Sequence, residues 1–280
     1  MRQSDPEQQL SIHHRGGGSS IARISRIGGA LQALTLDGQQ MIVEPDGDFS
    51  KVFFGSVLAP WPNRLDGGQF EHLGKVHRVG VLDDQKNANH GLLFTQELRV
   101  VEHHDDSLTL EHDFGPANGY PWQLTMSLSY SILENELLVQ ARVQNHSAEP
   151  APFAIGFHPY FLSGKSFELT GDFKGRVITD DRMLPIGTEE ISGLRFSGGD
   201  LDHCFFGSKT VALVSELGSL EVELGDNLDH FMFYRPGPDL GDLIAIEPMS
   251  SGANAFNLDI ENNLLQPNET KNFSFVIRKR

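Results

Sequence analysis

The chain is poor in cysteine, and this limits what can hold the fold together. Cys204 has no partner within the 280 residues, so the sequence contains no intramolecular disulfide. A chain without disulfides is typical of a reducing compartment, which predicts a cytoplasmic location. We interpret Cys204 as a small buried hydrophobe near a strand.

Long apolar runs and an excess of basic residues are also missing. No stretch approaches the roughly 18 apolar residues of a membrane-spanning helix, and residues 1–18 contain no apolar secretion segment. The 22 basic residues stand against 38 acidic ones, which gives a formal net charge of −16. This balance argues against nucleic acid and anionic membranes as partners. Because residues 1–18 are polar and include a triple glycine, we expect a flexible N-terminal tail before one domain over residues 19–280.

What the sequence has in abundance is alternation of apolar and polar residues. Over 123–132, apolar side chains alternate with threonine and serine, which predicts a half-buried strand. A polar turn at 134–136 and a second alternating run over 139–144 complete a hairpin. Further strands are predicted at 20–27, 30–36, 107–112, 152–158, 166–170, 210–216, 219–224, 230–234, 243–247 and 272–278.

Turn-forming residues separate these strands. The chain has 29 glycines and 14 prolines, and Gly218 marks a second predicted hairpin. No stretch of about twelve residues shows helical periodicity. The pattern predicts an all-β fold, a large antiparallel β-sandwich in a single domain. The polar segments 60–72 and 83–91 are long loops, and such loops carry function on a sheet scaffold.

The run Ala-Pro-Trp-Pro-Asn-Arg at 59–64 is the first candidate for ligand binding. Its two prolines hold the backbone extended, so Asn63 and Arg64 present an amide and a planar guanidinium beside Trp61. An aromatic face next to planar donors suits a sugar, which offers C–H faces and hydroxyls. Taken alone, the run reads more simply as a turn that carries a solvated arginine.

Two predicted strands lead to residues that can transfer protons. Small residues precede His158 on its face of strand 152–158, so we expect open space above the sheet there. Strand 243–247 ends in Glu247, and a carboxylate at this position is costly unless it is paired or faces a cleft. A proline follows each residue and keeps it extended. Each also has a plainer reading: a core histidine bonded to the backbone, and a rim glutamate bonded to a neighbour.

Other candidates are weaker, and metal chemistry has little support. His90 lies in the loop before an apolar segment and Asp202 follows a Gly-Gly turn, positions where such residues are usually solvated. The sequence contains no H-E-x-x-H, C-x-x-C, P-loop or dinucleotide-binding fingerprint. The acidic and histidine-rich run at 102–106 is interpreted as a solvated turn. We therefore expect no metal site and no cofactor.

Taken in order, these segments resemble the aldose 1-epimerase (galactose mutarotase-like) family. The resemblance covers residues 55–278 and includes the segment before the last predicted strand, 265–270. It implies a mutarotase-like supersandwich with a sugar cleft across one sheet, no cofactor, and a small sugar as partner. The matching motifs are Pro-Asn-Arg at 62–64, Asn-His-Gly at 89–91, His-Pro-Tyr-Phe at 158–161, Leu-Asp-His-Cys-Phe at 201–205 and Ile-Glu-Pro at 246–248.

The resemblance also implies roles for individual residues. By motif, Glu247 corresponds to the general base, His158 to the general acid and His90 to the second active-site histidine. Departures at 60–62 and 249–252 indicate a divergent bacterial branch and leave the preferred sugar open. The candidate sugar-binding residues are Arg64 and Asp202 by motif, together with Asn63 and Trp61 from the 59–64 run.

Interconversion of the α and β anomers of a hexose needs one acid and one base. The base takes the C1 hydroxyl proton while the acid protonates the ring oxygen, and unperturbed pKa values of about 4.3 for glutamate and 6.5 for histidine supply both states. We expect Glu247 and His158 to converge on opposite sides of one bound sugar. His90 would stabilise charge at the ring oxygen, and Arg64 with Asp202 would fix the orientation.

Three other functions remain open on sequence alone. A hexose-6-phosphate 1-epimerase would need further cations near the cleft, for which Arg78 and Arg99 are candidates. A non-catalytic sugar-binding protein would explain the platform at 59–64 but not an acid and a base. A glycoside hydrolase would use Asp202 and Glu247 as its carboxylate pair and would leave the histidines without a role.

Overall fold

The computed structural model describes residues 8–14, 16, 19–43, 52–80, 82–117, 119–237 and 240–280. Strands form nearly all of the regular structure, as the alternation predicts. Within the described residues, α1 (Ala255–Leu258) is the one α-helix, a single turn long. No helix in that part of the chain is long and apolar enough to cross a membrane.

The largest sheet has nine antiparallel strands. On β12, the apolar residues of the predicted alternation are buried and the threonine and serine residues are half-buried on the other face. The predicted hairpins, β12–β13 and β22–β23, are both confirmed. The strand order is β10 (Arg99–His103), β11 (Ser107–Phe114), β12 (Leu124–Ile132), β13 (Glu136–Asn145), β27 (Thr270–Lys279), β23 (Gly218–Leu224), β22 (Thr210–Ser215), β17 (Phe167–Gly171) and β20 (Leu194–Phe196).

A second, eight-stranded sheet provides most of the candidate site residues. Its strand β25 is buried along its whole length and lies between β24 and the short strands β15 and β16. The order is β19 (Pro185–Glu190), β18 (Gly175–Thr179), β21 (Asp202–Phe206), β24 (His230–Tyr234), β25 (Leu243–Met249), β15 (Gly156–Phe157) and β5 (Val57–Leu58), with β16 (Tyr160–Leu162) also paired to β25. Cys204 is buried on β21, as expected.

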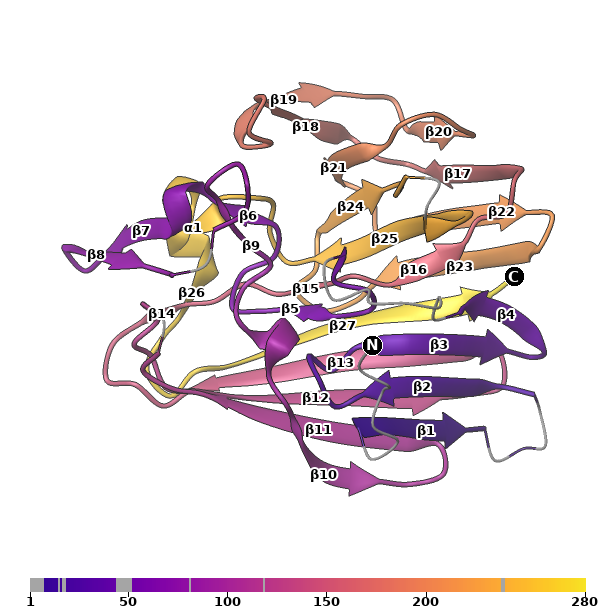
Figure 1. Cartoon of the computed structure of the whole chain (residues 1–280), viewed down its shortest axis with the longest axis horizontal. Coiled ribbons are helices and arrows are strands. Elements are labelled where there is room, and N and C mark those ends of the chain that lie inside the picture. Colours follow the sequence, from indigo (N-terminus) through magenta and orange to yellow (C-terminus); the bar gives the residue numbers. More distant parts are fainter. Residues whose placement is uncertain are drawn as a thin grey trace.

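A four-stranded sheet and three small strand pairs complete the architecture. The four-stranded sheet runs in sequence order, and the three small pairs lie together at one end of the molecule, on the left in Figure 1. The four strands are β1 (Gln9–His13), β2 (Ile21–Ser25), β3 (Leu31–Leu36) and β4 (Gln39–Ile42). The pairs are β6 (Arg64–Leu65) with β9 (Ala88–Asn89), β7 (Gln69–His72) with β8 (Lys75–Arg78), and β14 (Ala151–Pro152) with β26 (Leu264–Leu265).

The four-stranded and eight-stranded sheets both lie against the nine-stranded sheet (Figure 1). From the four-stranded side, the backbone oxygen of Gly29 accepts a hydrogen bond from the Tyr130 hydroxyl at 2.6 Å. From the eight-stranded side, the ring of Phe157 lies 4.8 Å from that of Phe275. One cluster of buried apolar side chains therefore extends from the first sheet to the last strand. The molecule is a single-domain antiparallel β-sandwich, which confirms the predicted fold class.

Part of the expected N-terminal tail is structured. Residues 9–13 form β1, where Ile12 is fully buried and the backbone N–H of His13 donates to Asp105 O at 2.5 Å. The expectation of a flexible tail over all of 1–18 is therefore wrong for residues 9–13. The rest of the proposed tail includes residues 1–7, 15, 17 and 18, which lie outside the described residues.

The predicted strand over 152–158 is two short strands that join different sheets. β14 pairs with β26, whereas β15 pairs with β25 and β5. Between them the backbone N–H groups of residues 153–155 donate to Asn263 O, Pro60 O and Ser250 Oγ. The segment 152–158 is apolar because the chain is buried where it passes from one sheet to another, and it does not form one continuous strand.

Candidate active site

A cavity of about 230 Å³ lies between β6–β9 and the eight-stranded sheet. Ligand cavities are usually larger, about 300–1,000 Å³ for drug-sized molecules, so this volume suits a single small ring. The cavity brings together six of the seven predicted site residues and leaves out Trp61. Its lining consists of Val52, Phe53, Asn63, Arg64, Asn89, His90, His158, Tyr160, Asp202, Met232, Tyr234 and Glu247.

Glu247 and His158 contact each other in this cavity. Oε1 of Glu247 lies 3.4 Å from Nε2 of His158, and the carboxylate residue is only 2% exposed. β25 carries Glu247 opposite Met232 of β24. The expected convergence in one cavity is therefore found. The expectation that the two residues flank a sugar from opposite sides is wrong, because the gap between them is too small and a ligand must meet both from one side.

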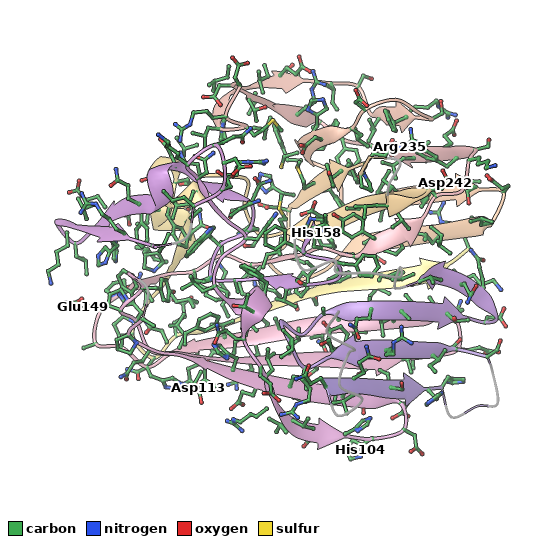
Figure 2. All side chains as sticks on the ribbon, viewed as in Figure 1. His104, Asp113, Glu149, His158, Arg235 and Asp242 are labelled. Atoms are coloured by element: carbon green, nitrogen blue, oxygen red, sulfur yellow. The ribbon has the colours of Figure 1, made fainter. Side chains whose placement is uncertain are left out.

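The backbone and an aromatic neighbour fix His158. It follows β15, and its N–H donates to Ser56 O at 3.0 Å while its carbonyl accepts from Gly55 N–H at 2.9 Å. Its ring stacks on Tyr160 with centroids 4.8 Å apart. The labelled His158 lies near the middle of the view in Figure 2, and the residue is buried. The imidazole is thus held in one orientation toward Glu247.

Burial shifts the proton affinities of this pair far from ordinary values. Desolvation raises the pKa of the Glu247 carboxyl well above its usual range, the charge of Asp202 raises it further, and the Arg64 guanidinium partly opposes both. Desolvation also lowers the pKa of the His158 imidazole. The assumption that both residues work near their unperturbed pKa values is therefore wrong. Burial thus favours the neutral forms, a carboxylic acid beside a neutral imidazole.

His90 is held as a neutral hydrogen-bond donor. Its Nδ1 accepts the backbone N–H of Asn63 at 3.2 Å, and the backbone N–H of His90 donates to Asn63 O at 3.0 Å. Burial lowers its pKa well below the usual range, and the nearby charges of His158 and Arg64 act in the same direction. Because Nδ1 is an acceptor, the proton of the neutral ring sits on Nε2. His90 can therefore donate one hydrogen bond at the cavity.

Arg64 and Asp202 supply charge of opposite sign. Asn63 Oδ1 accepts from the Arg64 backbone N–H at 2.8 Å and from its Nη1 at 3.4 Å, so Asn63 positions the arginine. Nε of Arg64 lies 3.9 Å from Asp83 Oδ2. Asp202 begins β21 opposite Tyr234, and burial raises its pKa while Arg64 opposes that shift. Asp202 faces the cavity, whereas Asp200 lines a separate groove.

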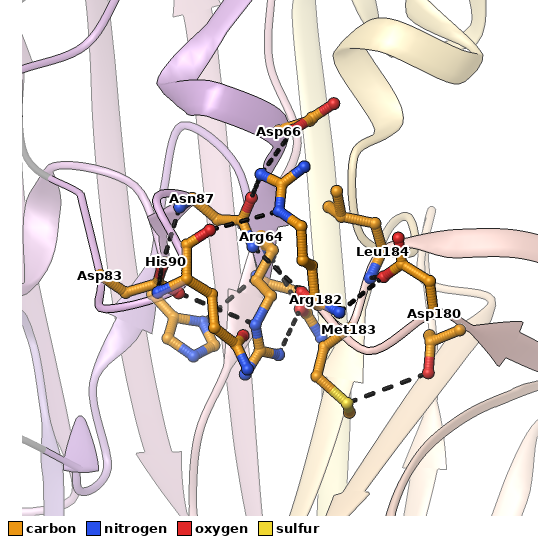
Figure 3. Close-up of polar contacts among 12 residues, drawn as sticks. Arg64, Asp66, Asp83, Asn87, His90, Asp180, Arg182, Met183 and Leu184 are labelled. Carbon is orange, nitrogen blue, oxygen red and sulfur yellow. Dashed lines mark hydrogen bonds and ion pairs between the residues drawn. The ribbon is translucent and has the colours of Figure 1, made fainter.

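Arg182 ties a hairpin to the loop beside Arg64 (Figure 3). It lies at the tip between β18 and β19, and its Nη2 contacts Asp66 Oδ1 at 2.8 Å and Asn87 Oδ1 at 2.7 Å. In return, Asn87 Nδ2 donates to Arg182 O at 3.0 Å. Asp83 Oδ1 accepts two backbone N–H groups of the same loop, from Gln85 and Asn87. The hairpin thus supports the loop that carries the counter-charge of Arg64.

The cavity wall contains polar atoms that the protein itself leaves unsatisfied. Buried side-chain polar atoms nearly always have a hydrogen-bond partner, so each exception needs an explanation. A ligand with several hydroxyl groups would supply the missing partners. Among the described side chains, the buried atoms of this wall without a hydrogen-bond partner are Arg64 Nε, Asn89 Oδ1, His158 Nδ1 and Glu247 Oε2.

Trp61 does not belong to the site. Its side chain is 3% exposed and packs against Phe256 at 6.2 Å between ring centroids, so the predicted sugar platform is wrong at this residue. The expected space above Gly156 is also filled, since a Cβ there would lie 2.8 Å from Pro62 and 3.1 Å from Met249. The prolines fix the backbone direction of the run, but tertiary packing decides which side chains face the core.

Sequence reasoning missed several residues that line the cavity. Tyr160 and Asn89 stand next to predicted residues within the recognised motifs, and Tyr234 and Met232 share a face of the predicted strand 230–234. Phe53 gave no signal. Its φ of 55° is costly for an aromatic residue, and its ring packs 4.4 Å from His90 and 6.4 Å from His158.

The cations proposed for a sugar phosphate lie away from the cavity. Arg78 is exposed on β8, and Arg99 is exposed on β10 with Glu111 as its ion-pair partner. Arg64 is the one lysine or arginine among the lining residues that the structure describes. No group of three or more histidine, cysteine or acidic side chains in that part of the chain is placed to hold a metal ion.

Known proteins of similar sequence and fold agree with this architecture. Residues 8–278 match the family model described as aldose 1-epimerase. The uncharacterized protein YihR of Escherichia coli K12 is 26% identical over 97% of this chain and 96% of its own length. A GalM/aldose epimerase homologue from C. elegans shares the fold with a TM-score of 0.83 at 18% identity, covering 96% of this chain and 98% of that one. Galactose 1-epimerase from Lactobacillus acidophilus NCFM gives 0.78 at 19% identity, with 97% and 98% covered.

Proposed function

The chain belongs to the aldose 1-epimerase family, and from that premise we propose that it interconverts the α and β anomers of a hexose. The observation that carries this proposal is the 3.4 Å contact between His158 Nε2 and Glu247 Oε1 in a cavity for one small ring. The two oxygens bonded to C1 of a pyranose are neighbours, so two adjacent groups can serve both from one side.

The proton count of the pair fits this reaction. Glu247 as carboxylate takes the proton of the C1 hydroxyl, and His158 as imidazolium gives a proton to the ring oxygen. The bond between C1 and the ring oxygen breaks, and C1 becomes an aldehyde. The pair then consists of a carboxylic acid and a neutral imidazole, which are the forms that burial favours. Burial of the pair therefore lowers the energy of the ring-opened state relative to the initial ion pair.

Ring closure reverses these steps on the other face of the aldehyde. Rotation about the C1–C2 bond turns that face toward the released hydroxyl, which adds to C1 while the same two protons return. His90 donates from Nε2 to the ring oxygen as charge develops. Arg64 and Asp202 hold the hydroxyls of the open chain in place. The Phe53 ring, packed on His90, keeps water from the two histidines.

Replacing the base tests the proposal. We expect Glu247→Gln to lower the enzymatic rate by about 10²- to 10⁴-fold, because the amide cannot accept the C1 proton. Sugar binding should remain measurable, since the amide fills the same space. Polarimetry on freshly dissolved α-glucose and α-galactose measures the rate, and calorimetric titration measures the binding.

Glu71→Gln provides a matched control, because Glu71 is exposed on β7 outside the cavity. It should anomerise sugars at the rate of the unmodified protein. Near-normal turnover by Glu247→Gln would refute the role of this residue. Saturable sugar binding by the unmodified protein without any rate acceleration would instead identify a sugar-binding protein on the same fold.

A further inference from the structure

The strand pair β6–β9 carries a donor and an acceptor that the protein does not satisfy. Arg64 and Asn89 are direct cross-strand partners, so their side chains leave the pair on the same side, with Cβ atoms roughly 5 Å apart. Both side chains line the cavity. Asn89 Oδ1 and Arg64 Nε are buried and have no hydrogen-bond partner among the described residues. The 3.9 Å contact of Nε with Asp83 is an ion pair too long for a hydrogen bond.

The residues next to Asn89 in the sequence do have hydrogen-bond partners, so the missing partner is specific to Asn89. Two residues earlier, the Asn87 amide is bonded through both its oxygen and its nitrogen to Arg182. One residue later, His90 accepts the Asn63 backbone N–H. Between these satisfied side chains, Asn89 lines the cavity, and its buried oxygen has no hydrogen-bond partner among the described residues. A buried acceptor in this state calls for an explanation, and a ligand hydroxyl in the cavity provides one.

We propose that Asn89 is a specificity-determining residue, which together with Arg64 binds one hydroxyl group of the sugar. The hydroxyl donates its proton to Asn89 Oδ1 and accepts from the Arg64 guanidinium. The proposed function supplies the assumption that the ligand is a sugar. The Arg64 guanidinium carries only hydrogen-bond donors and lies across the strand pair from Asn89. The Asn89 side chain is therefore oriented with its oxygen, and not its nitrogen, on the side of Arg64. Among the groups of a pyranose, a hydroxyl both donates and accepts, whereas the ring oxygen only accepts.

Asn89 should affect binding and leave the proton transfers unchanged. The reacting pair is carried by β25 and the end of β15, whereas Asn89 lies on β9. A hydroxyl away from C1 keeps its hydrogen bonds when the ring opens, so the contact stabilises the bound sugar and the transition state equally. Loss of such uniform binding raises KM and leaves kcat unchanged.

Sugar analogues test this proposal directly. The hexose that the protein binds best is compared with its 2-, 3-, 4- and 6-deoxy and deoxyfluoro analogues by calorimetric titration. Fluorine takes the place of the hydroxyl but cannot donate to Asn89. We expect one position at which fluorine weakens binding to the unmodified protein by about tenfold or more. Asn89→Ala should bind the parent sugar about 3- to 30-fold more weakly and should no longer distinguish hydroxyl from fluorine at that position.

Two variants serve as controls. Asn89→Asp keeps an acceptor at the same place and should restore the distinction between hydroxyl and fluorine. Asn262→Ala removes an exposed amide that bonds only to nearby Asp259 among the contacts described, and it should bind all analogues as the unmodified protein does. Thermal unfolding of each variant confirms that the fold is intact.

The outcomes separate this proposal from the proposed function. Unchanged binding by Asn89→Ala, or a lower kcat at constant KM, would overturn the role of Asn89. If the unmodified protein binds hexoses without accelerating mutarotation, the proposed function fails, and the fluorine comparison still decides the role of Asn89. A protein that binds no hexose at all would overturn both.

Discussion

Glu247 is an acidic side chain kept out of water, and its burial has a cost in stability. Glutamate in an unfolded chain loses its proton near pH 4.3, whereas burial and the charge of Asp202 raise the pKa of Glu247 in the folded protein. Between these two pKa values the folded state binds more protons than the unfolded state. Stability contributed by this group is therefore present at low pH and is lost as the pH rises through the folded pKa.

The Glu247→Gln variant should consequently be more stable than the unmodified protein in alkaline solution. Glutamine does not titrate, so we expect its unfolding temperature to exceed that of the unmodified protein at about pH 8, with a difference that shrinks toward pH 5. Thermal unfolding across a pH series measures this difference. Equal midpoints at every pH would contradict the desolvation of the carboxyl group.

Single residues were predictable where a local motif fixed them. His158 and Glu247 each sit between an apolar strand and a proline, and both reach the cavity. Trp61 was misassigned because its burial depends on Phe256, a contact that local sequence does not encode. The pKa shifts were missed for the same reason, since desolvation depends on every element packed around the group.

Among the elements, the tip of the β18–β19 hairpin supports the cavity wall that carries Arg64. We expect Arg182→Ala to free the loop over 83–87, because Asp66 and Asn87 both lose their contacts with the guanidinium. KM should rise about three- to tenfold, the range of one ordinary hydrogen bond, because the lost contacts act on the cavity only through the loop, with a smaller change in kcat. Steady-state kinetics and hydrogen exchange of residues 83–90 measure the two effects.

Arg176→Ala is the matched control on the same hairpin. Arg176 lies on β18 and pairs with Glu189, so its loss leaves the Arg182 contacts in place. Normal exchange over 83–90 in Arg182→Ala would show that the loop keeps its structure without the hairpin.

The positions of the long strands could be predicted from their alternation of apolar and polar residues, whereas those of the short strands could not. β12 and β13 match their predicted ranges within two or three residues at each end. β6 and β9 have two residues each, and their pairing joins segments more than twenty residues apart, so no local period marks them. The site wall that holds Arg64 and Asn89 was therefore the part of the fold least visible in the sequence.

At the scale of the whole molecule, the N-terminal sheet is an integral part of the core. Ile12 of β1 is fully buried in the same apolar cluster as the strands of the large sheet. We expect Ile12→Ala to lower the free energy of unfolding by about 2–5 kcal/mol, the usual cost of truncating a buried isoleucine. Anomerisation of the folded variant should be unchanged, because this sheet contributes no lining residue.

Denaturant unfolding of Ile12→Ala, beside Ser11→Ala on the other face of β1, measures the effect. An unaltered midpoint would show that β1 is only loosely attached.

The fold class was predictable, since alternation without helical periodicity leaves few architectures. The division into sheets of four, eight and nine strands was not, because pairings such as β13 with β27 depend on contacts between distant segments.

The two sides of the cavity are formed by separate structural elements. His158 and Glu247 belong to the buried eight-stranded sheet, while Arg64 and Asn89 belong to a two-residue strand pair braced from outside by Arg182. Under the proposed function, we therefore expect substitutions around Arg182 to alter which sugars bind and to leave the His158–Glu247 pair undisturbed. In a lineage with the proposed function, mutations in this surface hairpin would change the preferred sugar, while His158 and Glu247 are inherited unchanged.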